Sequence, residues 1–169
     1  MLDAFLASPA EVAIGANVAL ADVAQLAQAC SEADRFLFLN VDNCAGLAQD
    51  RRGVDHVQRV GVTAILSTRA SLVQHANSIG MITMQKVFVT DRSTLPRSIN
   101  SIEHSKPDLT QLMPWPVLSR VPPEVLRQLG AFVAAGFVQN RDDVVEALQQ
   151  GAAAVSTSES KLWQASRSS

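Results

Sequence analysis

The stretch Ala64-Ile-Leu-Ser-Thr-Arg69 is a short apolar run that ends abruptly in hydroxyl and guanidinium groups. The same pattern recurs at Ala153-Ala-Val-Ser-Thr-Ser158. A short apolar run is typical of a parallel strand that is buried on both faces of its sheet. Ligands of α/β folds bind where such strands end. The two stretches therefore predict an α/β fold whose functional groups lie at the carboxyl edge of the sheet.

Helical and strand patterns alternate along the rest of the chain. Strands are expected at 12–18, 36–41, 63–66, 81–89, 109–113, 131–135 and 153–156. Helices are expected at 1–8, 20–30, 53–59, 70–79, 93–104 (with Ser93 as N-cap), 123–129 and 141–150. This alternation predicts a parallel sheet with right-handed crossovers. Pattern alone leaves an open sheet and a closed barrel as alternatives, and 169 residues is small for a barrel, which usually takes about 250.

Length and composition indicate one domain, residues 1–169, of ordinary globular character, with 47% hydrophobic and 18% charged residues. The net charge of −2 excludes a global positive field that would recruit nucleic acid, so any such contact needs a local patch. Cys30 and Cys44 lack the spacing of a metal site and are expected to be reduced thiols. With no apolar run of membrane-spanning length and no basic signal start, the expected location is the cytoplasm.

Basic residues gather at or beyond the expected strand ends, which share one face in a parallel sheet: Arg51, Arg52, Arg69, Lys86 and Arg92. Arg69 directly follows two hydroxyl residues and is expected to bind an anion, most simply a phosphate group. For Arg51 and Arg52, a solvated loop and a phosphate or RNA contact are equal alternatives.

Lys86 interrupts an apolar strand, where an unpaired ammonium group is rarely tolerated. We expect it to face the sheet's mouth, paired with a phosphate or with an acid such as Asp42; the alternative is an edge lysine in water. Asp42 follows its own strand, and it either accepts a ligand hydroxyl or caps its loop. Gly136 and Ser156 to Ser158 follow the last two strands, the usual phosphate loops of barrels, although Ser158 could instead cap a helix at 159–164.

Other chemistries lack a signal in the sequence. His56, His75 and His104 have no partner at metal-ligand spacing, so we predict no metal site. No phosphate-binding glycine motif is present, and no acid–base pair stands out, so we predict no catalytic residue and no cofactor. Tyr is absent and the two Trp are far apart, so no aromatic RNA platform is expected.

Several stretches resemble, in order and spacing, the glycerol-3-phosphate-responsive antiterminators of glycerol-uptake operons. The resemblance spans about residues 36–163 and rests on Asp42…Gly46-Leu47…Asp50…Gly53, Ile65 to Arg69, Gly80 to Phe88, Lys106-Pro107-Asp108, Met113-Pro114, Ala135-Gly136, Ala152 to Ser158 and Leu162-Trp163. It implies a TIM-barrel-like fold that binds glycerol-3-phosphate as its effector. It also implies action on the leader mRNA of glycerol-metabolism genes, where the protein would prevent premature termination.

The resemblance also implies roles for particular residues. Those that would line the mouth are Asp42, Ser67, Thr68, Arg69, Gln85 and Lys86, and those that would hold the phosphate are Ala135, Gly136, Ser156, Thr157 and Ser158. Candidates for RNA contact are Arg51, Arg52 and Arg92. Residues 1–8 match the family's first helix, so the barrel would lack the family's first strand. An open edge of this kind would favour a homodimer or strand exchange.

Two other functions remain as alternatives. One is a small isomerase or lyase acting on a sugar phosphate, with Asp42 and Lys86 as acid and base. The other is a degenerate paralogue that binds no ligand and serves as an interaction scaffold through its open edge.

Overall fold

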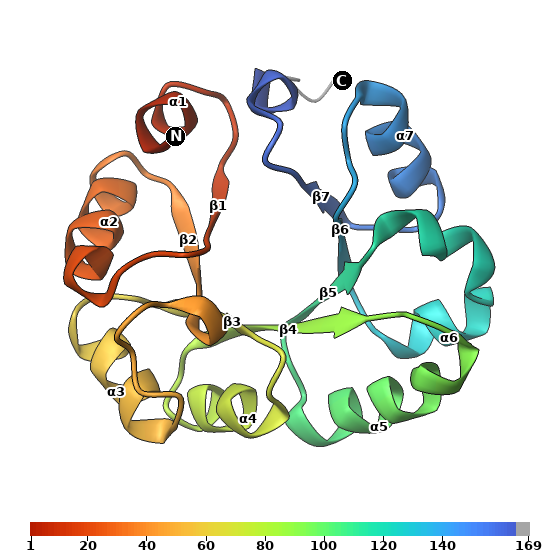
Figure 1. Cartoon of the computed structure of the whole chain (residues 1–169), viewed down its shortest axis with the longest axis horizontal. Helices are drawn as coiled ribbons and strands as arrows, with labels where there is room; N and C mark the ends of the chain where they lie inside the picture. Colours follow the sequence, from red (N-terminus) through yellow and green to blue (C-terminus); the bar gives the residue numbers. More distant parts are fainter. Residues whose placement is uncertain (165–169) are drawn as a thin grey trace.

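Seven parallel strands stand side by side around a common centre, and the helices cover their outer side (Figure 1). The computed structural model describes residues 1–164. The strands are β1 (Val12–Gly15), β2 (Phe36–Asn40), β3 (Ala64–Ser67), β4 (Ile82–Phe88), β5 (Leu109–Met113), β6 (Phe132–Ala135) and β7 (Ala154–Ser156). The α-helices are α1 (Leu2–Leu6), α2 (Leu20–Glu32), α3 (Arg51–Arg59), α4 (Ala70–Ser78), α5 (Leu95–Ser105), α6 (Pro123–Gln128) and α7 (Arg141–Gln149). This confirms the predicted TIM-barrel-like α/β fold.

The ring of strands is nearly closed. Each strand pairs with the next one in the chain, from β1 to β7. Within residues 1–164, β1 and β7 do not pair with each other, and the ring stays open at that seam (Figure 1). On its outer side, α1 contacts the short 3-10 helix η4 (Ser160–Gln164), where Phe5 and Trp163 meet edge to face with ring centroids 6.2 Å apart.

Side chains alternate between the inside of the ring and the helices outside, because successive residues of a strand point to opposite faces. The inner layer is a small apolar cluster of Phe38, Ala64, Leu66, Met84 and Val133, with Ile14, Phe36 and Leu109 packed against it. Two larger clusters lie between the strands and the helices. The sheet is thus apolar on both faces, which explains the short unbroken apolar runs in the sequence.

Some predicted boundaries are wrong for local reasons. The strand expected at 12–18 ends at Gly15, and Asn17 follows with a φ of 57°, in the left-handed region that no strand continues through. Ser93 does not cap α5; its N–H and hydroxyl both donate to Asp91, which forms a separate 3-10 turn before α5 begins at Leu95. No helix among residues 1–164 has the length and apolarity needed to cross a bilayer.

Candidate ligand-binding site

The carboxyl ends of the strands open on one mouth of the ring. Lys86 and Gln111 are paired in register on β4 and β5, and Ala135 is paired with Ser156 on β6 and β7. Met84, Leu109 and Val133 belong to or pack against the inner cluster, and each lies two residues before one of these positions on its strand. Strand alternation therefore turns Lys86, Gln111 and Ala135 inward as well, with Ser156 beside them.

Lys86 is the cation of this mouth. Its side chain is partly buried, and burial lowers its pKa from the ordinary 10.5, while the negative charge of Asp42 acts in the opposite direction. The ammonium group also lies 6.0 Å from the centre of the Phe88 ring. A partly desolvated ammonium group that makes no contact ion pair within residues 1–164 is well suited to attract an anion.

Asp42 links the ends of β2 and β3 by two hydrogen bonds. Ser67 donates its hydroxyl to Asp42 Oδ1 at 2.6 Å, and the Thr68 N–H donates to Asp42 Oδ2 at 2.6 Å. The structure thus brings these three predicted residues together, but their donors point at a carboxylate of the protein itself. An anion bound at Ser67 and Thr68 would have to displace that carboxylate or meet its negative charge.

The predicted arginines all lie on the surface. The Arg69 guanidinium donates to the Gln49 carbonyl at 3.0 Å, which holds it over the loop that follows β2. Arg51, Arg52 and Arg92 are exposed, the first two at the start of α3 and the third in the 3-10 helix Arg92–Thr94 (η2). Among residues 1–164, none of the four contacts a carboxylate within 4 Å, so their charges remain available to a partner.

The prediction that Gln85 lines the mouth is wrong. Gln85 points outward from β4 toward α5, where its Nε2 donates to Ser101 Oγ at 2.7 Å and its Oε1 accepts a hydrogen bond from the Ser105 hydroxyl. The physical reason is the pleat of the strand, since Lys86 faces inward and its neighbour must face the other side.

The residues after β6 and β7 differ from those after β3 in side-chain size and in hydrogen bonding. Gly136 has a φ of +79°, and a Cβ at this position would lie 3.1 Å from Met113 Cε, so a side chain here would be strained and crowded. The Thr157 hydroxyl donates to the Val138 carbonyl and accepts from the Glu159 N–H, so it braces the turn. The Thr157 hydroxyl thus stabilises the turn before η4, and Ser158, the predicted alternative cap, is exposed.

The start of α7, which follows the β6 end, offers no anion site. Asn140 accepts a hydrogen bond from the Asp143 N–H. Asp143 in turn accepts from the N–H groups of Gln139 and Asn140. Because this helix end is already filled by a carboxylate, a phosphate at the β6 and β7 ends would depend on the strand-end residues themselves.

Three features of the mouth were missed from the sequence. Gln111 is only 4% exposed and donates to Ser156 Oγ at 3.2 Å. Phe88 and Phe137 are 52% and 73% exposed, at the ends of β4 and β6. Phe88 lies two residues after Lys86 on β4, so both side chains lie on the same face of the strand, and this spacing is visible in the sequence. Lys86 was noticed because it is a polar residue within an apolar strand. Gln111 is also a polar residue within an apolar strand, so the same criterion would have identified it.

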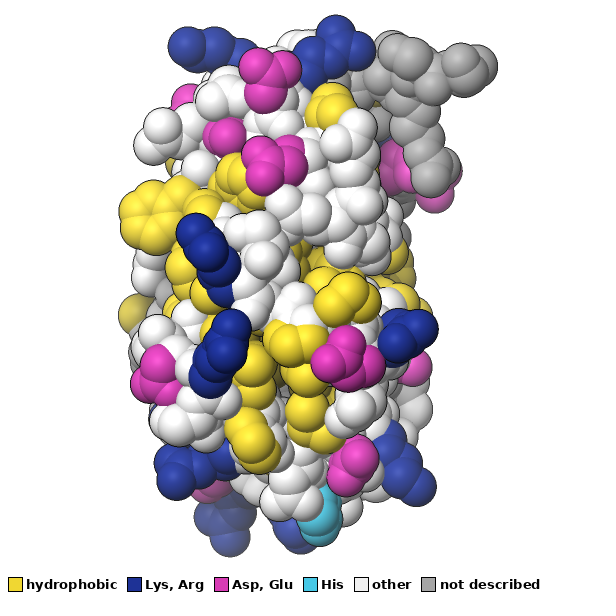
Figure 2. All heavy atoms as spheres, turned by 90° about the vertical axis from the view of Figure 1, so that its right-hand side faces the viewer, with side chains coloured by type: hydrophobic (Ala, Val, Ile, Leu, Met, Phe, Trp, Pro, Cys, Tyr) yellow, Lys and Arg dark blue, Asp and Glu magenta, His cyan; other side chains and the backbone are white. Residues whose placement is uncertain are grey.

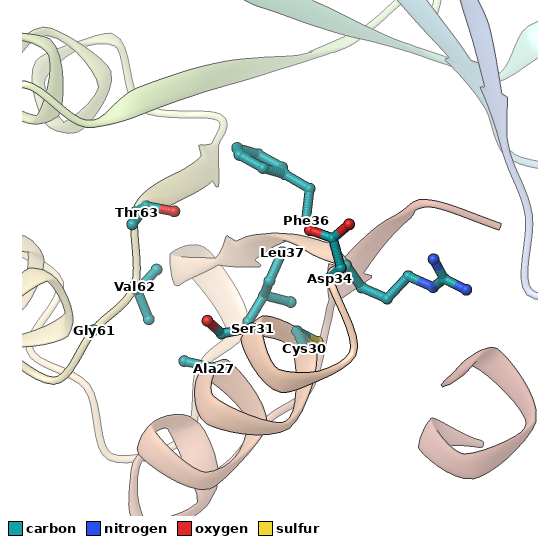
Figure 3. A pocket seen from close by; sticks show the side chains of 10 residues that line it. Ala27, Cys30, Ser31, Asp34, Phe36, Leu37, Gly61, Val62 and Thr63 are labelled. Atoms are coloured by element: carbon teal, nitrogen blue, oxygen red, sulfur yellow. The ribbon is translucent and has the colours of Figure 1, made fainter. Parts of the chain in front are cut away.

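Two other parts of the surface of residues 1–164 differ from the mouth. A hollow of about 240 Å³ lies at the opposite end of the ring, lined by residues of α2 and by residues at the amino ends of β2 and β3. Figure 3 shows the side chains that line it. On the outer face that carries α5 to α7, hydrophobic patches and side chains of both charges are interspersed (Figure 2). That face lacks the uniform positive charge expected of a nucleic-acid contact.

The histidines lie on helices α3, α4 and α5, and both cysteines are buried. His75 Nε2 and Asp55 Oδ1 lie 2.6 Å apart in a hydrogen bond between α4 and α3. Cys30 and Cys44 are buried free thiols, and burial raises the pKa of both. In the part of the chain that the structure describes, no three His, Cys, Asp or Glu side chains are grouped so that they could hold a metal ion.

Comparisons with known proteins agree with the fold. The sequence model of the family described as "Glycerol-3-phosphate responsive antiterminator" matches residues 1–163. A glycerol uptake operon antiterminator regulatory protein from Listeria monocytogenes has a similar structure, with a TM-score of 0.90 at 22% identity over 98% of this chain and 90% of that one. An antiterminator-related protein from Thermotoga maritima gives 0.84 at 20% identity over 97% and 92%. The uncharacterized protein YgcP of Escherichia coli is 23% identical over 83% of this chain and 74% of that protein.

Proposed function

The chain belongs to the glycerol-3-phosphate responsive antiterminator family, and on that premise we propose that it is a regulator whose barrel mouth binds glycerol-3-phosphate. In this proposal the bound effector favours a state that binds the leader mRNA of glycerol-metabolism genes. The observation that carries the proposal is the partly buried Lys86 at the carboxyl end of the barrel, which shares the inner face of the sheet with the small Ala135 of β6 and the hydroxyl-bearing Ser156 of β7.

We place the phosphate group of the effector at the ends of β6 and β7. Ala135 has a small side chain and Gly136 has none, the Ser156 hydroxyl can donate, and Lys86 supplies the positive charge. The end of β3 is the less suitable position, because Asp42 already accepts the hydrogen bonds of Ser67 and Thr68.

The same hydrogen bonds favour a regulator over an isomerase or lyase. A general acid or base must reach the proton that it transfers. Both carboxylate oxygens of Asp42 accept hydrogen bonds at 2.6 Å, which suits a structural role at the ends of β2 and β3.

Ligand binding is tested by thermal unfolding with glycerol-3-phosphate, glycerol and inorganic phosphate added separately. A specific ligand at about 100 times its dissociation constant stabilises the fold by about 2.7 kcal/mol, which for a chain of this length raises Tm by about 5–10 °C. We expect a larger shift with glycerol-3-phosphate than with either fragment. The absence of such a shift would refute the sensor and favour the scaffold.

The position of the phosphate is tested with two variants. Ser156→Ala is expected to weaken glycerol-3-phosphate binding, whereas Arg69→Ala should retain it, because the Arg69 guanidinium lies on the Gln49 carbonyl. The reverse result would move the phosphate to the end of β3.

RNA binding is tested with a leader transcript from a glycerol-metabolism gene of the same genome, with and without effector. We propose that the exposed Arg51, Arg52 and Arg92 contact RNA phosphates. Affinity should then fall steeply with salt, and each arginine replaced by Ala should reduce the slope of log K against log salt by about 0.7–0.9. Binding that ignores both salt and effector would contradict the RNA part of the proposal.

A further inference from the structure

Gln111 is a buried polar side chain whose hydrogen bonding is incomplete. It lies in the middle of β5, 4% exposed, and faces the inside of the ring beside Lys86. Its Nε2 donates to Ser156 Oγ at 3.2 Å. Its Oε1 is fully shielded from solvent and has no hydrogen-bond partner among residues 1–164. Buried carbonyl oxygens normally have a partner, because removing them from water without one is unfavourable.

Gln85 shows how the same fold treats a glutamine that has a purely structural role. It is 2% exposed and lies on the adjacent strand, one residue before Lys86. Its amide is used at both ends, by Ser101 and Ser105 of α5. Two similarly buried glutamines therefore differ in one respect. The amide of the outward Gln85 is fully hydrogen-bonded, whereas the inward Gln111 has a carbonyl oxygen without a partner among residues 1–164.

The chemistry of the free atom defines what can bind it. A carbonyl oxygen accepts hydrogen bonds and cannot donate one. The non-bridging oxygens of a phosphate dianion are also acceptors, so the phosphate end of an effector gains nothing from Gln111 Oε1. A hydroxyl group can donate to it. The neighbours Lys86 and Ser156 are donors, and these suit the anionic end.

We propose that Gln111 is the specificity-determining residue of the mouth, and that its Oε1 accepts a hydrogen bond from a hydroxyl group of a phosphorylated polyol. The polyol end then lies deeper in the ring than the phosphate, which stays at the ends of β6 and β7. This inference rests on the proposed function, because it assigns one end of the proposed effector to a residue of the same site. It predicts discrimination between a phosphorylated polyol and phosphate alone.

The test is isothermal titration calorimetry of the wild type, Gln111→Met and the matched control Gln85→Met, each with glycerol-3-phosphate and with inorganic phosphate. Gln111→Met should weaken glycerol-3-phosphate binding about fivefold to tenfold more than it weakens phosphate binding, because only the former loses the hydrogen bond to Oε1. Gln85→Met should leave the ratio of the two affinities at the wild-type value. An unchanged ratio in Gln111→Met would overturn the inference, and it is also the result expected if Oε1 only binds a structural water.

A second measurement does not depend on how well the variant folds. The wild type is titrated with 2-hydroxypropyl phosphate and 3-hydroxypropyl phosphate, each of which lacks one hydroxyl of glycerol-3-phosphate. We expect one of them to bind about fivefold to tenfold more weakly than glycerol-3-phosphate. If both bind as tightly as glycerol-3-phosphate, the inference is wrong while the sensor stands. If the wild type does not bind glycerol-3-phosphate at all, both the inference and the proposed function fail.

Discussion

Replacing Asp42 by Asn tests whether the ends of β2 and β3 are held together by one carboxylate. Asp42 accepts two hydrogen bonds of 2.6 Å, from the buried Ser67 hydroxyl and from the exposed Thr68 N–H. An Asn side chain has one carbonyl oxygen, so it can retain at most one of them. A hydrogen bond to a charged group contributes about 1.5–3 kcal/mol, and the exposed Thr68 amide can turn to water. We therefore expect a loss of about 2 kcal/mol in the free energy of unfolding.

The assay is chemical denaturation of a double-mutant cycle made of Asp42→Asn, Ser67→Ala and the combined variant. A loss of about 2 kcal/mol lowers Tm by about 4–8 °C in a chain of this size. The two substitutions should be coupled by about 1 kcal/mol or more. If their effects add within about 0.5 kcal/mol, the 2.6 Å bond makes no net contribution and the reasoning fails. Inorganic phosphate should still bind to Asp42→Asn, because the carboxylate is not a donor to it.

Three further predictions concern Lys86, the two thiols and the seam of the ring. Burial lowers the pKa of Lys86 below 10.5 in the folded protein, so between the folded and the unfolded pKa the unfolded chain binds more protons. The free energy of unfolding should therefore rise with pH through that range. Lys86→Met should abolish this rise, measured by denaturation at several pH values, and should also abolish phosphate binding. Cys30 and Cys44 should react with a thiol reagent at pH 8 only after unfolding in guanidinium, since both are buried with raised pKa values; rapid labelling of the native protein would contradict this. Phe5→Ala should lower stability by about 3 kcal/mol in calorimetry, and a loss below about 1 kcal/mol would mean that the contact with Trp163 does little to hold the seam.

The strands were predictable because their signal is local. Most are short apolar runs that end in a glycine, a hydroxyl or a charge, and burial on both faces is enough to produce that pattern. The seven strands follow, with boundaries that shift by at most three residues. The early end of β1 could not be read from the sequence, because it depends on the left-handed conformation of Asn17, whose side chain accepts a hydrogen bond from Asn43 on the loop after β2.

The site was predictable only in part, because it depends on which way each side chain points. The apolar residues around Gln85 and Lys86 do not show which of the two faces inward. Two adjacent strand residues, however, cannot both face the mouth. That rule alone would have removed one of them from the predicted site. The hydrogen bonds of Asp42 join groups 25 and 26 residues apart, and they follow from the register of β2 against β3, which no local pattern specifies.

The strictly sequential order of the strands has a consequence for how the molecule folds. Because every strand pairs with its neighbours in the chain, each strand–helix unit can dock on the one before it, and few distant segments must find each other first. The contact between α1 and η4 is different, since it joins the first and last helical elements that the structure describes. It can form only after the sheet between them exists. Substitutions in this contact should therefore speed unfolding and leave the folding rate nearly unchanged, as expected for a contact made after the transition state.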